Sequence, residues 1–297
     1  MATLYTQQSK NVTRTWLLMG VFLAIIVAIG YFVSYYYNNP AILYIAIVFS
    51  IVMNITGYWF SDKIALSSTG AVEADEKEYI ELHRILENLA ITAGLPKPRL
   101  YIINDMAPNA FATGRDKEHA AVAVTTGLLQ MLDRSELEGV IAHELSHIGN
   151  RDILLSTVVV VLVGFIAMLS DMFLRASLFG RNRDREEGGN GIIMIVGIVF
   201  VVLSPIIATI IQLAISRKRE FLADASGALL TRYPDGLANA LKKISSYSQP
   251  MQRASNATAH LFISNPFGGK TMNGIAKLFM THPPTEERIE ALMGMKV

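Results

Sequence analysis

The longest uncharged stretch of the chain is the feature that most constrains its fold. No charged residue occurs between Arg14 and Asp62, and residues 38–40 divide the stretch into the apolar runs Trp16–Tyr37 and Ala41–Phe60. At 1.5 Å per helical residue these runs reach about 33 and 30 Å, which matches a hydrocarbon core of roughly 30 Å. The turn between them is too short for anything but a hairpin, so the N-terminal part is predicted to cross a membrane twice.

A cleaved signal peptide is the competing interpretation of the first run. It fails because the run is too long and a second span follows at once. Two further apolar runs, Ile153–Met172 and Gly191–Ile215, predict a second hairpin, and the mean hydropathy of +0.36 also indicates lipid. A buried core helix can be equally apolar, so that alternative stays open for the second pair.

The basic residues around the first hairpin predict its orientation. Lys10, Arg14 and Lys63 flank it on one side, and its turn carries no charge. Because cytoplasmic loops carry the excess of Lys and Arg, the N-terminus and residues 61–152 are expected in the cytoplasm. The loop between the two later runs does not follow this rule if both runs cross the membrane fully. It would then lie outside the cytoplasm, although it carries Arg175, Arg181, Arg183 and Arg185. Partial insertion of the second pair is the alternative.

Charge and cysteine content narrow the kinds of site. The 26 Lys and Arg residues balance 25 Asp and Glu residues, giving a formal net charge of +1. No phosphate-reading surface is indicated, and nucleic acid is not an expected partner. The chain has no cysteine, which excludes disulfides, thiol nucleophiles and cysteine-based zinc sites. Any metal must be held by His, Asp and Glu.

The water-soluble residues are numerous enough for one compact domain of the α+β class. This domain is split, with residues 61–152 before the second pair of apolar runs and residues 216–297 after it. Residues 1–60 form the first hairpin and residues 153–215 the second. The chain is therefore expected to be a mainly helical membrane protein with about four transmembrane helices and a small β-sheet.

Periodicity and turn residues predict the elements of that domain. An amphipathic helix is expected over Glu73–Ala93. Three strand-like runs follow: Arg99–Ile103, Asn109–Thr113 and His119–Thr125. Asp133 and Glu136 form a capping box that begins a helix from Arg134 to about Ile148. Later helices are expected through about Leu230, near Leu237–Ser246, and at the C-terminus with Ile289, Leu292 and Met293.

The helix that begins at Arg134 carries His-Glu-Leu-Ser-His at residues 143–147. At 100° per residue, His143 and His147 lie on one face of the helix. Imidazoles one turn apart can share a tetrahedral Zn²⁺, and Glu144 can act as general base on the attacking water. A chance match is expected in roughly 0.6% of chains with this composition, so surface histidines are the weaker interpretation.

A tetrahedral catalytic site needs a third protein ligand. The extended motif with a downstream histidine is absent, because Asn150 and Ile153 stand where its glycine and histidine would be. A downstream glutamate is the natural substitute, and Glu220 follows the last apolar run on the side of the histidines. Asp224, one helical turn further on, could orient a ligand histidine through its second N–H. An exposed helix face is the alternative interpretation of Glu220 and Asp224.

Four separated motifs together resemble the HtpX membrane metalloproteases, which belong to the broader family that includes the CAAX prenyl proteases. They are His143–His147 followed by Arg151-Asp152, the Arg219–Asp224 element, Asn109–Gly114, and Thr281-His282-Pro283. The match runs over essentially the whole chain, with the motifs in the expected order. The resemblance implies a zinc endopeptidase with one Zn²⁺ per chain on His143, His147 and Glu220, and with Glu144 as catalytic base.

The resemblance also implies a setting. Such a protein acts in bacterial protein quality control on damaged or misfolded membrane proteins, from the bacterial inner membrane, with its catalytic domain facing the cytoplasm. An extended substrate can pair with an exposed strand edge through main-chain hydrogen bonds. Together with the resemblance, this assigns substrate binding to an edge strand formed by Asn109, Ala110, Phe111 and Ala112. The resemblance assigns His282 a hydrogen bond to the oxyanion. The alternatives are an internal strand and a capping or surface histidine.

Two rival functions belong to other classes. In a zinc-transport component the histidines would be a docking site, but Asp171 is the only ionisable residue of the spans, and ion pathways generally need more. A catalytically silent membrane scaffold is the weaker rival because Glu144 is present. A helical lid from the segment between Ser248 and Asn273 could keep the site closed. The sequence assigns no oligomeric state.

Overall fold

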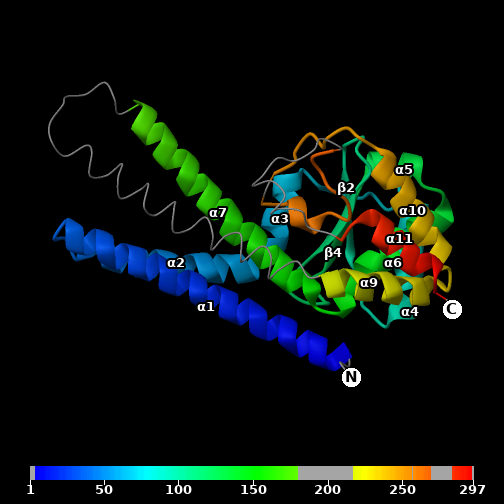
Figure 1. The fold of residues 1–297 in the computed structure, drawn as a ribbon, viewed down its shortest axis with the longest axis horizontal. Coiled ribbons are helices and arrows are strands. Elements are labelled where there is room, and N and C mark those ends of the chain that lie inside the picture. The colour runs from blue at the N-terminus through cyan, green and yellow to red at the C-terminus, as the bar shows by residue number, and fades with distance from the viewer. Residues whose placement is uncertain (1–3, 180–216, 256, 269–282, 296–297) are drawn as a thin grey trace.

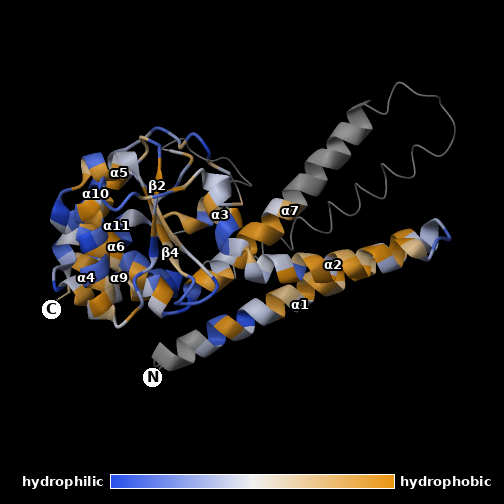
Figure 2. Ribbon diagram, turned by 180° about the vertical axis from the view of Figure 1, so that it is seen from behind, coloured by the Kyte–Doolittle hydropathy of each residue, from blue (hydrophilic) through white to orange (hydrophobic). Residues whose placement is uncertain are grey.

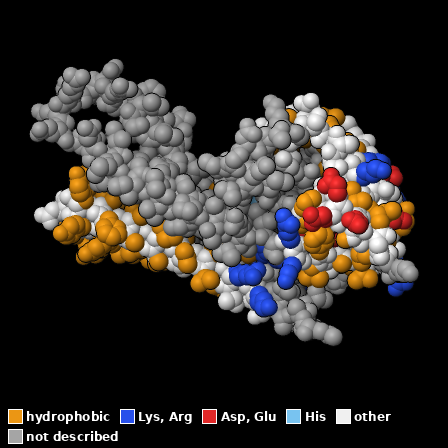
Figure 3. Space-filling view, in the orientation of Figure 1, with side chains coloured by type: hydrophobic (Ala, Val, Ile, Leu, Met, Phe, Trp, Pro, Cys, Tyr) orange, Lys and Arg blue, Asp and Glu red, His pale blue; other side chains and the backbone are white. Residues whose placement is uncertain are grey.

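Two long apolar helices form a hairpin at the N-terminus of the computed structural model, which describes residues 4–179, 217–255, 257–268 and 283–295. Helix α1 (Leu4–Tyr36) packs against α2 (Ala41–Trp59). Both are long and apolar enough to cross a membrane. The hairpin projects from the rest of the molecule, and its projecting part is hydrophobic (Figure 2). Large apolar side chains cover its exposed flank (Figure 3). The first two predicted spans are confirmed.

A third long helix, α7 (Asp152–Phe179), contains the predicted run Ile153–Met172. Its first half packs against α1 through buried side chains that include Leu155, Val159 and Leu162, and the helix then diverges from the hairpin (Figure 1). An angle of 86° separates α6 from α7, so they count as a third span only if they form one broken crossing. The predicted run Gly191–Ile215 lies outside the described residues.

A four-stranded mixed sheet forms the centre of the remaining part. Its strands are β1 (Val72–Glu73), β2 (Arg99–Ile103), β3 (Ala110–Thr113) and β4 (Ala121–Thr125). The spatial order is β1-β2-β4-β3, with β2 and β4 parallel and the other pairs antiparallel. The three predicted strands are present, and the α+β class is confirmed. Strand β3 ends the sheet among the described strands.

One predicted element was partly wrong. The helix expected over Glu73–Ala93 begins only at Ile80, as α4 (Ile80–Ala93). Glu73 instead pairs with Tyr101 in strand β1. The Asp75 carboxylate then accepts hydrogen bonds from the backbone N–H groups of the second and third residues after it, at 2.8 and 3.0 Å. This Asx-type turn competes with helix formation, which an aspartate commonly does near a helix start.

Helices cover both faces of the sheet (Figure 1). On one face, Leu100, Ile102 and Val122 of the sheet pack against α4, α6 and α10 in one core. On the opposite face, Phe111 and Ala121 pack in a second core with residues of α3 and α7. The α-helices not yet bounded, and one 3₁₀ turn, are α3 (Ser61–Thr69), α5 (Thr126–Met131), α6 (Arg134–Gly149), α9 (Arg217–Thr231), α10 (Pro234–Ser246), η2 (Ala259–Leu261) and α11 (Thr285–Met293).

Helix α6 begins as the sequence predicts. The Asp133 carboxylate accepts a hydrogen bond from the Glu136 backbone N–H at 3.0 Å, and the Glu136 side chain accepts one from the Asp133 N–H at 2.9 Å. Helices α9 and α10 pack directly on α6. The residues before and after the second pair of apolar runs therefore share one core around this helix.

Candidate metal centre

Helices α6 and α9 bring the predicted ligands together. His143 and His147 occupy one face of α6, while Glu220, Asp224 and Gly227 follow each other at helical spacing on α9. A Cβ atom on Gly227 would lie only 3.0 Å from the backbone nitrogen of His143. A glycine at this position lets α9 lie close against α6, which places the Glu220 carboxylate beside both imidazoles.

Three side chains point their ligand atoms at one place. The Nε2 atoms of His143 and His147 are 3.1 Å apart, and the Glu220 oxygens lie 3.8 and 3.7 Å from them. Two ligands of a tetrahedral zinc ion, each bonded at about 2.0–2.1 Å, stand about 3.3 Å apart. The donor set of two imidazole nitrogens and one carboxylate thus fits a single metal ion, and all three ligand atoms lie within 4.8 Å of one another.

Two buried carboxylates orient the imidazoles. Asp224 Oδ1 lies 2.9 Å from Nδ1 of His143, as the sequence predicts for an orienting residue. Asp152 Oδ2 accepts a hydrogen bond from Nδ1 of His147 at 3.1 Å. Holding Nδ1 in this way directs each Nε2 toward the centre. Sequence reasoning assigned no role to Asp152, although it follows the end of α6 within five residues of His147.

A buried arginine completes the surroundings of Asp224. The Nε and Nη2 atoms of Arg288 donate to the two oxygens of Asp224 at 2.8 and 2.6 Å, and Arg288 is 2% exposed. Burial by itself raises the pKa of Asp224, but the Arg288 guanidinium holds that pKa below its usual range. Sequence reasoning missed Arg288. Its spacing one turn before Leu292, on the buried face of α11, could have indicated it.

The first transmembrane helix reaches the same site. Nδ2 of Asn11, in α1, donates to Asp152 Oδ1 at 2.6 Å and to the carbonyl of Asn150 at 3.2 Å. Arg219 in turn donates to the Asn11 side chain at 3.4 Å and lies 3.9 Å from Asp152. This contact joins residues far apart in the sequence, and nothing in the pattern around Asn11 indicates it.

The two histidines differ in proton affinity. Burial lowers the pKa of His143 to about 4, so its ring is neutral at physiological pH. Burial also lowers the pKa of His147, but the hydrogen bond that its Nδ1–H donates to Asp152 and the charge of Glu220 outweigh this effect and raise that pKa to about 9. A metal ion and a proton therefore compete for His147 near neutral pH.

The centre lies under a cover of the chain's own residues. Glu144 is 2% exposed and borders a cavity of only about 30 Å³. His260 and Leu261 of η2 line the same cavity, and His260 Nε2 lies 2.9 Å from the carbonyl oxygen of Ser156 in α7. Within the described residues, this 3₁₀ turn is the only helical element between Ser248 and Asn273. A polypeptide substrate needs this cover to move.

The predicted substrate strand lies beside the centre. The Thr125 N–H donates to the Asn109 carbonyl at 3.0 Å, and the alternation of an antiparallel ladder then turns the main-chain groups of Ala110 and Ala112 away from β4. Ala112 lines the cavity next to Glu144. The Ala110 carbonyl already accepts a hydrogen bond of 2.9 Å from the Ile263 N–H.

The other two residues of the predicted substrate strand, Asn109 and Phe111, contact residues 262–264 through their side chains. The Asn109 side chain donates to the Ser264 carbonyl at 3.0 Å and accepts from the Ser264 N–H at 3.1 Å. The Phe111 ring packs edge-on against Phe262, with centroids 5.2 Å apart. Residues 262–264 therefore run along the outer edge of β3. His282, the predicted oxyanion donor, lies outside the described residues.

Comparison with known proteins decides the family. A model of peptidase family M48 matches residues 76–296. The chain belongs to this family. A protease HtpX homolog from Thermoanaerobacter pseudethanolicus is 52% identical over 299 residues, covering 99% of this chain and 98% of its own. One from Pyrococcus furiosus is 50% identical over 282 residues, covering 94% of each chain. The resemblance found in the sequence is confirmed.

The fold is also found in a solved structure. The crystal structure of S. mikatae Ste24p matches 97% of this chain with a TM-score of 0.50 and 19% identity, and this chain covers 66% of that protein. Family membership and the apolar hairpin make this chain a membrane-associated metalloprotease that acts on peptide substrates. They give no support to a scaffold or a metal transporter.

Proposed function

We propose that this chain is a zinc-dependent endopeptidase of the bacterial inner membrane, that its catalytic part faces the cytoplasm, and that it cleaves damaged or misfolded membrane proteins. The observation that carries the proposal is the cluster of His143, His147 and Glu220 with Glu144 at the same cavity. The HtpX relatives support the quality-control setting.

In this proposal His143, His147 and Glu220 hold one zinc ion per chain. Bound zinc supplies a Lewis acid that polarises the scissile carbonyl and favours deprotonation of water. Glu144 takes a proton from the attacking water as its oxygen bonds to the carbonyl carbon, and passes that proton to the amine as the C–N bond breaks. His282 donates a hydrogen bond to the oxyanion, a role implied by the resemblance.

The substrate is proposed to bind as an extended strand along β3. The outward-turned N–H and C=O groups of Ala112 lie next to the cavity of Glu144 and are suited to main-chain pairing, which tolerates many sequences. The same groups of Ala110 extend this edge once residues 262–264 leave it. The side chains of Asn109 and Phe111 contact Ser264 and Phe262, two of the residues that lie along this edge.

The chain is proposed to divide into two hairpins, residues 1–60 and 153–215, and a peptidase domain made of residues 61–152 and 216–297. Packing of α9 and α10 on α6 supports the shared domain. Basic side chains gather between the apolar hairpin and the peptidase part in the view of Figure 3. Their position supports a cytoplasmic peptidase domain, because such residues mark the cytoplasmic side.

The ligand assignment is tested by zinc content. The His143→Ala variant, purified in detergent and dialysed against trace zinc, is expected to lose stoichiometric zinc. Glu144→Gln is expected to keep it, because Glu144 is not a ligand. His83→Ala is the matched control, since His83 lies on α4 and contacts the Ala74 carbonyl at 3.2 Å. A His143→Ala protein that is folded and retains one zinc would contradict the assignment.

A further inference from the structure

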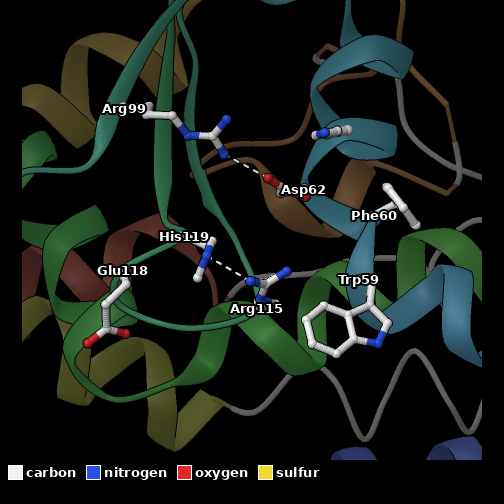
Figure 4. A pocket seen from close by; sticks show the side chains of 8 residues that line it. Trp59, Phe60, Asp62, Arg99, Arg115, Glu118 and His119 are labelled. Carbon is white, nitrogen blue, oxygen red and sulfur yellow. Dashed lines mark hydrogen bonds and ion pairs between the residues drawn. The ribbon is translucent and has the colours of Figure 1, made fainter.

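A second, larger cavity lies where the membrane hairpin meets the peptidase part. It measures about 450 Å³ and is lined by Trp59, Phe60, Asp62, Lys63, Arg99, Arg115, Glu118 and His119 (Figure 4). The lining residues come from the junction of α2 with α3, the start of β2 and the loop between β3 and β4. None of them lines the cavity at the metal centre. The peptidase reaction described above does not use this cavity.

The height of this cavity relative to a membrane follows from α2. Trp59 is the last residue of that apolar helix and Phe60 follows it, and both rings are about half exposed. Tryptophan at the end of a span prefers the level of the lipid headgroups. Asp62 is the first charged residue after Arg14. The cavity therefore opens at the level of the phospholipid phosphates.

Arg115 is fixed in position inside the cavity. Its guanidinium carbon lies 4.6 Å from the centroid of the Trp59 ring, and its Nη2 lies 2.7 Å from Nε2 of His119. Its Nε donates to Asp116 at 3.2 Å. A guanidinium has five N–H groups, so these contacts leave donors on both terminal nitrogens. Such a fixed, planar donor array suits a phosphate.

The charges of the lining residues suit one negative charge on a ligand. The cations of the lining are Lys63, Arg99 and Arg115. Arg115 is paired with Asp116 at 3.2 Å, whereas no carboxylate among the described residues forms an ion pair with Lys63. Arg99 is paired with Asp62 at 2.7 Å. Figure 4 shows Arg99 pointing toward Asp62 and Arg115 toward His119, while the Glu118 carboxylate points away from both guanidinium groups. Lys63 thus keeps an unpaired positive charge for an anion, and Arg115 adds the N–H donors of its terminal nitrogens.

We propose that this cavity binds the phosphodiester of a membrane phospholipid headgroup, with Arg115 as the main contact and Lys63 as a second cation. A phosphodiester carries a single negative charge, as the cavity requires, and is abundant at this depth. Lys63 Nζ lies 5.7 Å from the centroid of the Phe60 ring, which also lines the cavity. The bound headgroup would fix the position of the hairpin relative to the loop that follows β3.

The experiment measures binding of dihexanoylphosphatidylglycerol to the full-length protein in a neutral detergent, by the concentration dependence of its thermal stability. Dihexanoylglycerol tests the acyl chains without phosphate, and inorganic phosphate tests the free anion. Arg115→Gln and Arg115→Lys remove and partly retain the phosphate contact. Arg84→Gln is the matched control, because Arg84 is an exposed arginine of α4 that pairs with Glu81.

Saturable binding of the phospholipid is expected for the wild type and for Arg84→Gln. The apparent affinity should fall at least tenfold in Arg115→Gln and less in Arg115→Lys, with unchanged zinc content in every variant. Equal affinity in the wild type and Arg115→Gln would overturn the site. Inorganic phosphate that binds as tightly as the phospholipid, or dihexanoylglycerol that binds equally well, would overturn the headgroup assignment.

Discussion

Each ligand histidine is held by a carboxylate that is itself held by a further side chain. Asp224 is bound by Arg288, and Asp152 by Asn11. These contacts leave Nε2 of both rings for the centre. The carboxylates also stabilise positive charge on the imidazoles. Burial lowers the pKa of both rings, but Asp152, Glu220 and Glu144 raise the pKa of His147, whereas the charges of His147 and Arg288 lower that of His143.

The raised pKa of His147 predicts how zinc affinity depends on pH. Below its pKa of about 9 this ring must lose a proton to bind metal. The apparent affinity for zinc should therefore rise about tenfold per pH unit between pH 7 and 9. Competition with a chromophoric chelator at several pH values measures it. Asp152→Asn should flatten the dependence, and an affinity of the wild type that is constant above pH 7.5 would contradict the assignment.

The Asp224 carboxylate predicts a second effect at this scale. Asp224→Asn keeps the shape of the side chain but weakens its hold on both His143 and Arg288. Zinc affinity is expected to fall about 10–100-fold, as for other partners of ligand histidines. The same chelator competition measures it, with Asp235→Asn on α10 as the control. Unchanged affinity in Asp224→Asn would show that the carboxylate does not support the ligand.

Residues 262–264 lie along strand β3, next to the metal centre. The Ile263 N–H donates a hydrogen bond to the Ala110 carbonyl, which lies on the edge of β3 that a substrate strand would use. η2 covers the cavity beside Glu144. The metal centre is thus assembled while the cover is closed, and a polypeptide that binds along β3 would have to displace this segment.

Hydrogen exchange tests this opening. An extended peptide bound to the inactive Glu144→Gln variant is expected to displace Ile263 and speed exchange of its amide, because the amide loses its acceptor on Ala110. The Ala123 amide, in a strand paired with Phe111 inside the sheet, serves as the control and should not change. Bound peptide with full protection of the Ile263 amide would mean that the substrate does not use this edge.

Periodicity and capping predicted most elements because those signals are local. The helix with His143 and His147 begins at its capping box, and β2 has the predicted bounds. Glu73 was misassigned because its strand pairing with Tyr101 is a long-range contact, which overrides the helical pattern of the local sequence. Asn11 was not foreseen for the same reason, since it meets Asp152 only in the folded chain.

In the whole molecule, the membrane hairpin contacts a residue that orients one of the metal ligands. Asn11 of the first span contacts Asp152, which orients His147. The hairpin therefore supports the site directly as well as anchoring it. This arrangement also requires the metal centre to lie on the membrane side where α1 begins.

The absence of cysteine permits a direct test of orientation. A cysteine at Asn39→Cys, in the exposed turn between α1 and α2, should react with a membrane-impermeant maleimide in intact spheroplasts. A cysteine at Lys77→Cys, in the exposed turn before α4, should react only after permeabilisation. The opposite labelling pattern would place the peptidase domain outside the cytoplasm.

Cleavage of an unfolded model protein by the detergent-purified enzyme, after chelation and zinc add-back, tests the central claim most directly. The wild type should lose cleavage with the chelator and regain it with zinc. Glu144→Gln should bind zinc in equal amount yet cleave at a rate lower by several orders of magnitude, because no base takes the proton from water. Normal turnover by Glu144→Gln would contradict the mechanism, and cleavage by the metal-free wild type would contradict the metalloprotease assignment.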